Sequence, residues 1–168
     1  MKTGSNSEQA YVQRRALLSA GAAVAVAAGL SALGTQALAK ADRPLVEVWK
    51  DPNCGCCKDW MSHLTDNGFD VKAFDKGNTA ARAAFGMPQA LGSCHTAKVQ
   101  GYVIEGHVPA ADIRRLLAEK PQALGLAVPG MPIGSPGMDG AIYGGRRDPY
   151  SVLLVKKDGK TEVFSRYG

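Results

Sequence analysis

Beyond residue 44, the pattern of hydrophobic and polar positions switches between the period of a strand and that of a helix. Residues 45–49 are short, apolar and β-rich, which predicts a buried strand. Residues 54–67 repeat apolar side chains at helical spacing and are followed by Gly68, which predicts a helix that ends there. Residues 69–75 alternate apolar and polar side chains, as a second strand does. A strand–helix–strand unit is therefore expected to open the domain.

The pattern after residue 75 predicts further elements of both kinds. Residues 78–85 are a candidate for a short helix. A loop that contains Cys94 and His95 is expected next, followed by a strand over residues 99–104. A proline and an apolar face at helical spacing predict a helix over residues 110–120.

The C-terminal third combines an irregular segment with a hairpin. Residues 121–149 contain many glycines and prolines and show little periodicity, which predicts a loop. A loop of this length in a compact domain is usually functional or flexible. Residues 150–167 predict a β-hairpin with Asp158 and Gly159 at its turn. The order of elements predicts an α/β fold, a thioredoxin-like sheet with flanking helices and a Gly/Pro/Met-bearing C-terminal extension.

The first 39 residues differ from the rest of the chain. Arg14 and Arg15 precede an apolar Ala/Leu/Val/Gly stretch, and small residues flank Leu38. This is the order of an export signal, with cleavage expected after Ala39, and the arginine pair resembles a twin-arginine signal. An uncleaved inner-membrane anchor is the alternative, but the Ala and Gly content and the cleavage-like triplet favour cleavage. Both interpretations predict a periplasmic domain over residues 40–168, including the loop of residues 121–149.

Composition narrows the class of protein. The chain is 45% hydrophobic with a formal net charge of +5, which suits one globular domain. It has no basic stripe with interleaved aromatic residues, so nucleic acid is not an expected partner. A domain of this size buries enough surface to fold without a disulfide framework or a structural metal. The four cysteines are therefore available for chemistry.

Three of those cysteines, Cys54, Cys56 and Cys57, crowd the predicted start of the first helix. A helix N-terminus lowers the pKa of a thiol, and the thiolate is both the nucleophile and the metal ligand. By spacing alone, Cys54 and Cys57 after a strand predict a redox dithiol. The third thiol beside that pair would invite disulfide exchange in an oxidising compartment, and binding of all three to a metal removes this difficulty.

Soft thiolate ligands favour Cu(I), which makes copper the predicted metal. The adjacent Cys56 and Cys57 do not easily chelate one tetrahedral ion together, so a site that uses both is expected to bridge several copper ions through sulfur. Two alternatives stay open. The first is a periplasmic thiol–disulfide oxidoreductase that uses Cys54 and Cys57, and the second is a binding module held by structural disulfides or zinc.

Histidines and methionines offer further ligands. His95, beside the fourth cysteine, is explained equally well as a ligand and as a loop hydrogen-bonding residue. His107 is expected near the same end of the sheet, as a ligand or in a capping or solvated role. His63 is expected to be a helix-surface or packing residue and not a ligand. Met131 and Met138 lie in the irregular segment with few apolar neighbours, where core packing explains them less well.

Five segments in order, "CGCCKDW", "GSCHTA", "GYVIEGHVPA", "GLAVPGMP" and "GSPGM", together resemble the bacterial CopG-type copper-resistance proteins, long described as a domain of unknown function. The resemblance runs from about residue 45 to residue 150. It implies a periplasmic thioredoxin-like domain with a Met-bearing extension, copper bridged by cysteines, and a role in interconverting Cu(I) and Cu(II).

The positions of this sequence that the resemblance places at the metal are Cys54, Cys56, Cys57, Cys94, His95, Met131 and Met138. We therefore predict a monomeric periplasmic copper-binding protein that serves copper resistance. With redox turnover it would be an oxidoreductase of copper. Without turnover it would be a buffer or carrier that hands copper to a periplasmic efflux or carrier protein.

Overall fold

The computed structural model describes residues 43–168, and the predicted export signal with its cleavage site after Ala39 lies outside these residues. The described strands and helices, in chain order, are β1 (Leu45–Lys50), α2 (Gly55–Asp66), β2 (Asp70–Phe74), α3 (Thr79–Ala84), β3 (His95–Val99), β4 (Tyr102–Glu105), α4 (Ala110–Glu119), β5 (Gly125–Ala127), β6 (Tyr150–Val155) and β7 (Thr161–Tyr167). Within this part of the chain, no helix combines the length and the apolar character that a membrane crossing needs.

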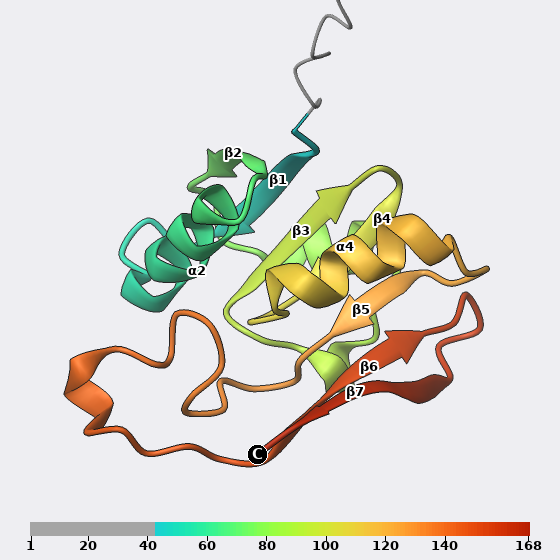
Figure 1. Ribbon diagram of the computed structural model, residues 1–168. Coiled ribbons are helices and arrows are strands. Elements are labelled where there is room, and N and C mark those ends of the chain that lie inside the picture. The colour runs from blue at the N-terminus through green and yellow to red at the C-terminus, as the bar shows by residue number, and fades with distance from the viewer. Residues whose placement is uncertain (1–42) are drawn as a thin grey trace, which may run out of the picture. The chain divides into compact units, whose positions relative to one another are not determined.

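One mixed sheet holds the seven strands of the described residues, in the order β2-β1-β3-β4-β5-β6-β7 (Figure 1). β1 runs parallel to β2 and antiparallel to β3, as a strand–helix–strand unit followed by a reversal requires. β4 and β5 are parallel, and β6 and β7 form an antiparallel pair. The predicted α/β fold, the opening strand–helix–strand unit and the C-terminal hairpin are confirmed.

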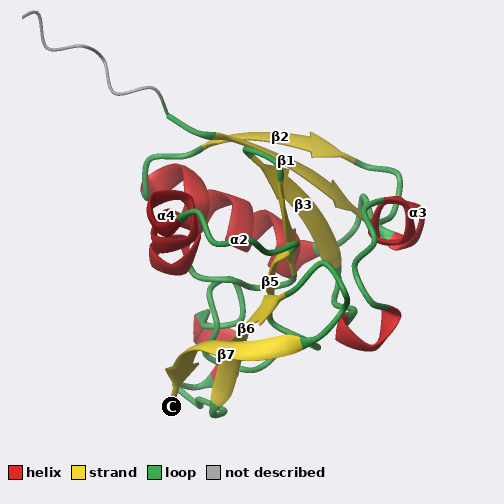
Figure 2. Cartoon of the chain, turned by 90° about the vertical axis from the view of Figure 1, so that its right-hand side faces the viewer, coloured by secondary structure: helices red, strands yellow, loops and turns green. Residues whose placement is uncertain are grey.

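Helices cover both faces of the sheet. α2 and α4 lie against one face and α3 lies on the other (Figure 2). The larger core fills the α2 and α4 side, where Val46 and Val48 of β1 join Trp60 and Leu64 of α2. Trp49, which points the opposite way from its neighbours on β1, stacks on Phe74 and contacts Phe85 edge-on, on the α3 side. Both faces of β1 are therefore packed.

The expectation of one strand over residues 99–104, preceded by a loop with His95, is wrong. Two antiparallel strands, β3 and β4, occupy this region and are joined by Gln100 and Gly101. The φ angles of these two residues are 45° and 90°, which is the conformation of a two-residue hairpin turn. His95 consequently begins a strand.

The predicted irregular segment of residues 121–149 also contains a strand that the pattern did not predict. β5 pairs with β4 on one side and with β6 on the other, so it lies inside the sheet. A Cβ atom at Gly125 would overlap the backbone of Val103, which explains a glycine at the start of this strand. The rest of the segment is irregular apart from a 3-10 turn at Ala141–Tyr143.

Strand register brings three chain segments to one edge of the sheet. Lys50 at the end of β1 pairs with His95 at the start of β3. On the other side of β3, Thr96 pairs with Glu105 at the end of β4. The turn after β1, the residue before β3 and the turn after β4 therefore meet where α2 begins.

Candidate metal centre

The first turn of α2 carries three cysteines. Cys54 is the N-cap of the helix in an extended conformation, and its own side chain makes no capping hydrogen bond. The turn before it is closed by Asp51, whose carboxylate accepts a hydrogen bond from the Asn53 N–H at 2.8 Å. Cys54 and Cys56 are half-buried and Cys57 is fully buried. The predicted position of these cysteines at a helix N-terminus is confirmed.

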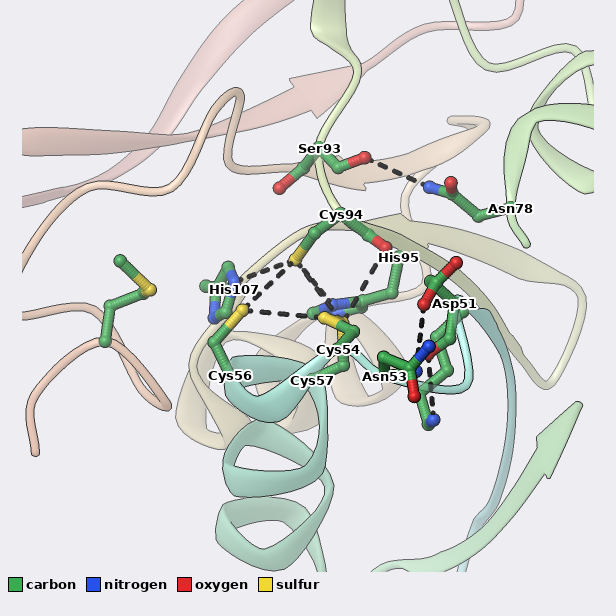
Figure 3. The surroundings of a disulfide bond; sticks show 12 residues. Asp51, Asn53, Cys54, Cys56, Cys57, Asn78, Ser93, Cys94, His95 and His107 are labelled. Atoms are coloured by element: carbon green, nitrogen blue, oxygen red, sulfur yellow. Dashed lines mark hydrogen bonds between the residues drawn. A yellow bond between two sulfur atoms is a disulfide. The ribbon is translucent and has the colours of Figure 1, made fainter. Parts of the chain in front are cut away.

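All four cysteines of the chain converge on one site (Figure 3). Their sulfur atoms lie within 4.8 Å of one another. Cys54 and Cys57 form a disulfide with a Cα–Cα distance of 5.4 Å, and Cys56 and Cys94 are free. The Cys94 sulfur lies 3.5 Å from that of Cys57 and 3.8 Å from that of Cys56. Residues 38 positions apart in sequence thus share one sulfur cluster.

Two imidazoles extend this cluster through Cys94. The Cys94 sulfur lies 3.1 Å from Nε2 of His107 and 3.3 Å from Nδ1 of His95. On the far side of its ring, His107 Nδ1 lies 2.8 Å from the carbonyl oxygen of Pro136. Because a carbonyl only accepts, Nδ1 carries the proton and the lone pair of Nε2 faces Cys94. His107 is therefore held in the tautomer that a metal ion at the sulfur cluster requires.

His95 is enclosed completely. Its ring lies between Trp60, at a centroid distance of 4.2 Å, and His107, at 5.0 Å. Its Nε2 atom is buried and has no hydrogen-bond partner, unlike the other buried side-chain nitrogen and oxygen atoms of the described residues. An unpartnered buried imidazole nitrogen is costly, and a metal ion is a partner that an imidazole nitrogen accepts. The donor set of thiols and imidazoles thus fits a soft transition metal.

Burial sets the protonation of these groups. Desolvation lowers the pKa of His95 well below its ordinary value, and the neighbouring His107 adds to this effect. Desolvation also lowers the pKa of His107, so both rings are neutral at neutral pH. Burial and the nearby Cys56 thiol raise the pKa of Cys94 to about 12. Cys94 is consequently protonated without metal, and a metal ion must displace that proton to bind the sulfur.

A buried ion pair fixes the residue before Cys94. Arg82 and Glu105, almost fully buried, approach within 2.8 Å. Glu105 accepts a hydrogen bond from the Ser93 N–H at 2.7 Å, and Arg82 donates to the Ser93 carbonyl at 2.6 Å. Asn78 donates to the same carbonyl at 3.0 Å. The peptide groups on both sides of Ser93 are therefore held rigidly, which fixes where the Cys94 side chain starts.

The C-terminal extension covers the start of α2. Gly137 has a φ of 83°, and a Cβ atom there would lie 2.6 Å from the Cys56 carbonyl and 2.7 Å from the Trp60 nitrogen. The next residue, Met138, is buried, and the Tyr143 hydroxyl donates to its sulfur at 3.3 Å. Met131 is half exposed and lines a shallow pocket together with Cys94. Both predicted methionines thus lie in segments that border the cysteine cluster.

The structure brings the four predicted cysteines and His95 together, and it adds His107. A solvated role for His107 is wrong, because its side chain is fully buried. The signal that would have found it is the β3–β4 hairpin, whose register continues from Glu105 to a position beside Cys94. His63 instead accepts a hydrogen bond from the Ala110 N–H at 3.1 Å and supports the start of α4.

Comparison with known proteins agrees with this geometry. A family model described as "Protein of unknown function, DUF411" matches residues 91–138, which include Cys94 and His107. A solved structure of "Copper resistance protein copG", form 2, is 44% identical with a TM-score of 0.69, and the alignment covers 75% of this chain and 99% of that chain. The chain belongs to the CopG family of copper resistance proteins.

A second structure of "Copper resistance protein copG", form 1, is 45% identical to this chain with a TM-score of 0.68. The alignment covers 73% of this chain and 96% of the chain in that structure. A search among curated proteins finds no match. Membership in the CopG family, together with the four-cysteine cluster, suggests that the protein binds copper.

Proposed function

We propose that this CopG-family protein serves periplasmic copper resistance by binding Cu(I) through Cys54, Cys56, Cys57 and Cys94 in their reduced state. The observation that carries the proposal is the convergence of four sulfurs within 4.8 Å of one another. Soft thiolates prefer Cu(I) over the harder divalent ions. Four thiolates in so small a volume repel one another, and monovalent cations between them relieve that repulsion. More than one copper ion, bridged by sulfur, is the arrangement that this crowding supports.

We further propose that the site interconverts Cu(I) and Cu(II). Cys94 belongs both to the group of four cysteines and to the group that it forms with His95 and His107. The harder Cu(II) prefers nitrogen ligands, and the two imidazoles are neutral and adjacent to the shared thiol. A copper ion bound at Cys94 can therefore exchange sulfur for nitrogen ligands as its charge changes. Met131 and Met138, which border the cluster, are proposed as additional thioether ligands.

We propose that this activity takes place in the periplasm. The twin-arginine-like segment before Ala39 supports export to the periplasm. We propose that residues 40–168 function there as a monomer. The proposed partner is a periplasmic copper efflux or carrier protein. Cys54 and Cys56 are partly exposed, which supports a transfer route, because ligand exchange between proteins needs a cysteine that the incoming site can contact.

An anaerobic titration with Cu(I) tests the proposed function. The purified protein is first fully reduced, and its copper content and ultraviolet thiolate-to-copper absorption are then followed to saturation. We expect stoichiometric binding with charge-transfer absorption, and a lower copper content in Cys56→Ser. The α2 surface variant Ser62→Ala is the matched control and should bind like the wild type. A fully reduced protein that retains no Cu(I) would refute the proposal.

One observation favours a second function. The disulfide between Cys54 and Cys57 occupies the C-x-x-C position after the first strand, where thiol–disulfide oxidoreductases carry their redox pair. That function predicts that Cys56→Ser keeps full insulin-reducing activity and binds no less copper than the wild type. A module held together by disulfides or zinc predicts that copper adds no charge-transfer absorption. The same titration and variant therefore separate the three functions.

A further inference from the structure

We propose that Cys54 and Cys57 are the electron donors of the copper site: their two thiols reduce two Cu(II) ions and close into the disulfide, while Cys56, Cys94 and His107 retain Cu(I). This inference rests on the proposed function and names the source of its electrons. It divides the four cysteines into a redox pair and a ligand pair. The structure shows the redox pair in its oxidised state, because Cys54 and Cys57 form a disulfide while Cys56 and Cys94 are free.

The first turn of α2 suits Cys54 and Cys57 for this role. Their Cα atoms lie 5.4 Å apart, within the range that a disulfide spans without backbone movement. The free N–H groups and the dipole of a 12-residue helix stabilise thiolate at this position, and thiolate is the form that gives up an electron. Opening and closing of this bond therefore requires no rearrangement of the fold.

The donors that remain after the disulfide closes still form a connected site. Cys56 and Cys94 have their sulfurs 3.8 Å apart, and the Nε2 lone pair of His107 faces the Cys94 sulfur at 3.1 Å. Two thiolates and an imidazole are ligands that Cu(I) accepts. Oxidation of the first pair thus removes two sulfurs from the metal without leaving the ion unbound.

Geometry keeps the two pairs separate. A thiolate attacks a disulfide along the axis of the S–S bond, so the three sulfur atoms lie on one line. The distance from the attacking sulfur to the far sulfur of the disulfide then exceeds its distance to the near sulfur by the bond length, about 2 Å. Cys94 lies 3.5 Å from the Cys57 sulfur, and an in-line position would place it about 5.5 Å from the Cys54 sulfur. All four sulfurs lie within 4.8 Å, so Cys94 is not in line.

The same comparison applies to the other free thiol. The Cys56 sulfur lies 3.6 Å from that of Cys54. In-line attack on Cys54 would place the Cys56 sulfur about 5.6 Å from the Cys57 sulfur. The two sulfurs lie within 4.8 Å of each other, so Cys56 is not in line either. In this arrangement neither Cys56 nor Cys94 is aligned for exchange with the disulfide. Its oxidising equivalents stay on Cys54 and Cys57.

The proposed step balances. Each of the Cys54 and Cys57 thiols releases one proton to solvent and gives one electron to one Cu(II) ion, and the two sulfurs then form one bond. The products are one disulfide, two Cu(I) ions and two protons. Restoring the dithiol needs an external dithiol, which attacks the sulfur of Cys54, because Cys54 is partly exposed whereas Cys57 is fully buried.

The test adds Cu(II) to the fully reduced protein without oxygen or added reductant. Loss of the Cu(II) electron paramagnetic resonance signal and capture of Cu(I) by a colour-forming chelator count the electrons transferred. Differential alkylation and peptide mass spectrometry identify the cysteines that have paired. We expect two Cu(I) ions for each disulfide, and a disulfide between Cys54 and Cys57.

Variants separate this inference from the proposed function. The double variant Cys54→Ser/Cys57→Ser should still bind Cu(I) through the remaining ligands but should lose the reduction of Cu(II), whereas Ser62→Ala should match the wild type. Reduction at the wild-type level in the double variant, or a disulfide that includes Cys56 or Cys94, would overturn the inference while Cu(I) binding stands. Failure of the reduced wild type to bind Cu(I) would overturn both.

Discussion

The Cys94 sulfur lies 3.1 Å from His107 Nε2, although the two residues belong to different strand ends. The β3–β4 hairpin creates this contact, because its register places the residue before β3 beside the turn after β4. The Pro136 carbonyl orients the His107 ring from the other side at 2.8 Å. The residue before β3, the turn after β4 and the C-terminal extension therefore define one ligand position together.

Replacement of His107 should weaken binding of Cu(II) more than binding of Cu(I). In His107→Gln, the nitrogen that faces Cys94 is lost, and we expect Cu(II) affinity to fall by at least about 10–100-fold, the loss that removal of even an outer-shell partner causes at a metal site. Competition with a chelator of known affinity measures it. His63→Ala is the control, because that ring contacts α4 and not the cluster. Equal losses in both variants would contradict this role for His107.

The metal-free protein should lose stability in acid. The folded state lowers the pKa of both His95 and His107, so the unfolded chain binds more protons as the pH falls below about 6.5, the ordinary value. The stability that the two neutral histidines contribute is therefore present above about pH 6.5 and is lost as the pH falls toward their lowered pKa values. Thermal unfolding at several pH values measures this. His107→Gln should show a weaker pH dependence than the wild type, and an unchanged slope would count against the prediction.

Loss of charge at Glu105 should destabilise the fold and disturb the position of Cys94. Glu105→Gln leaves Arg82 as an unpaired buried charge, and breaking a buried pair in this way costs about 3–5 kcal/mol of unfolding free energy. Glu47→Gln is the matched control, because its pair with Lys72 is exposed at 3.9 Å and contributes about 0–1 kcal/mol. Chemical denaturation measures both. Similar free energies for the two variants would refute the structural role of the buried pair.

A side chain at Gly137 should lift the extension from α2. Gly137→Ala combines a left-handed φ with a contact of 2.6 Å to the Cys56 carbonyl, and backbone strain of this kind costs about 1–3 kcal/mol. Gly140→Ala offers the comparison, since a Cβ atom there meets nothing within 4 Å. We expect a lower unfolding midpoint and a faster reaction of Cys56 with alkylating reagents in Gly137→Ala alone. Unchanged alkylation would show that the extension does not cover the cluster.

Local patterns predicted the parts of this protein that depend on local physics. The period of apolar residues identified β1 and α2, and a proline identified the start of α4, because amphipathic packing and caps leave direct marks in sequence. The turn at Gln100 and Gly101 was missed, because residues 95–98 are largely polar and do not themselves predict a strand before it. Without this turn, the contact between His107 and Cys94 could not be predicted.

Cys94 shows what sequence could not supply for the site. Its residue type and softness suggested a ligand, but its place beside α2 depends on the pairing of β3 with β1, which is a long-range contact. The short strand β5 was missed for a related reason. Three residues in a Gly/Pro-rich stretch carry too little periodicity to identify a strand, and only the neighbours β4 and β6 define it.

X-ray absorption at the copper edge of the fully reduced, Cu(I)-loaded protein tests the central claim most directly. We predict an edge characteristic of Cu(I) and a first coordination shell dominated by sulfur, with a sulfur contribution that falls in Cys94→Ser, because Cys94 belongs to both groups of candidate ligands. A first shell of nitrogen and oxygen alone, or a sulfur contribution unchanged in Cys94→Ser, would contradict a cysteine-bound copper centre.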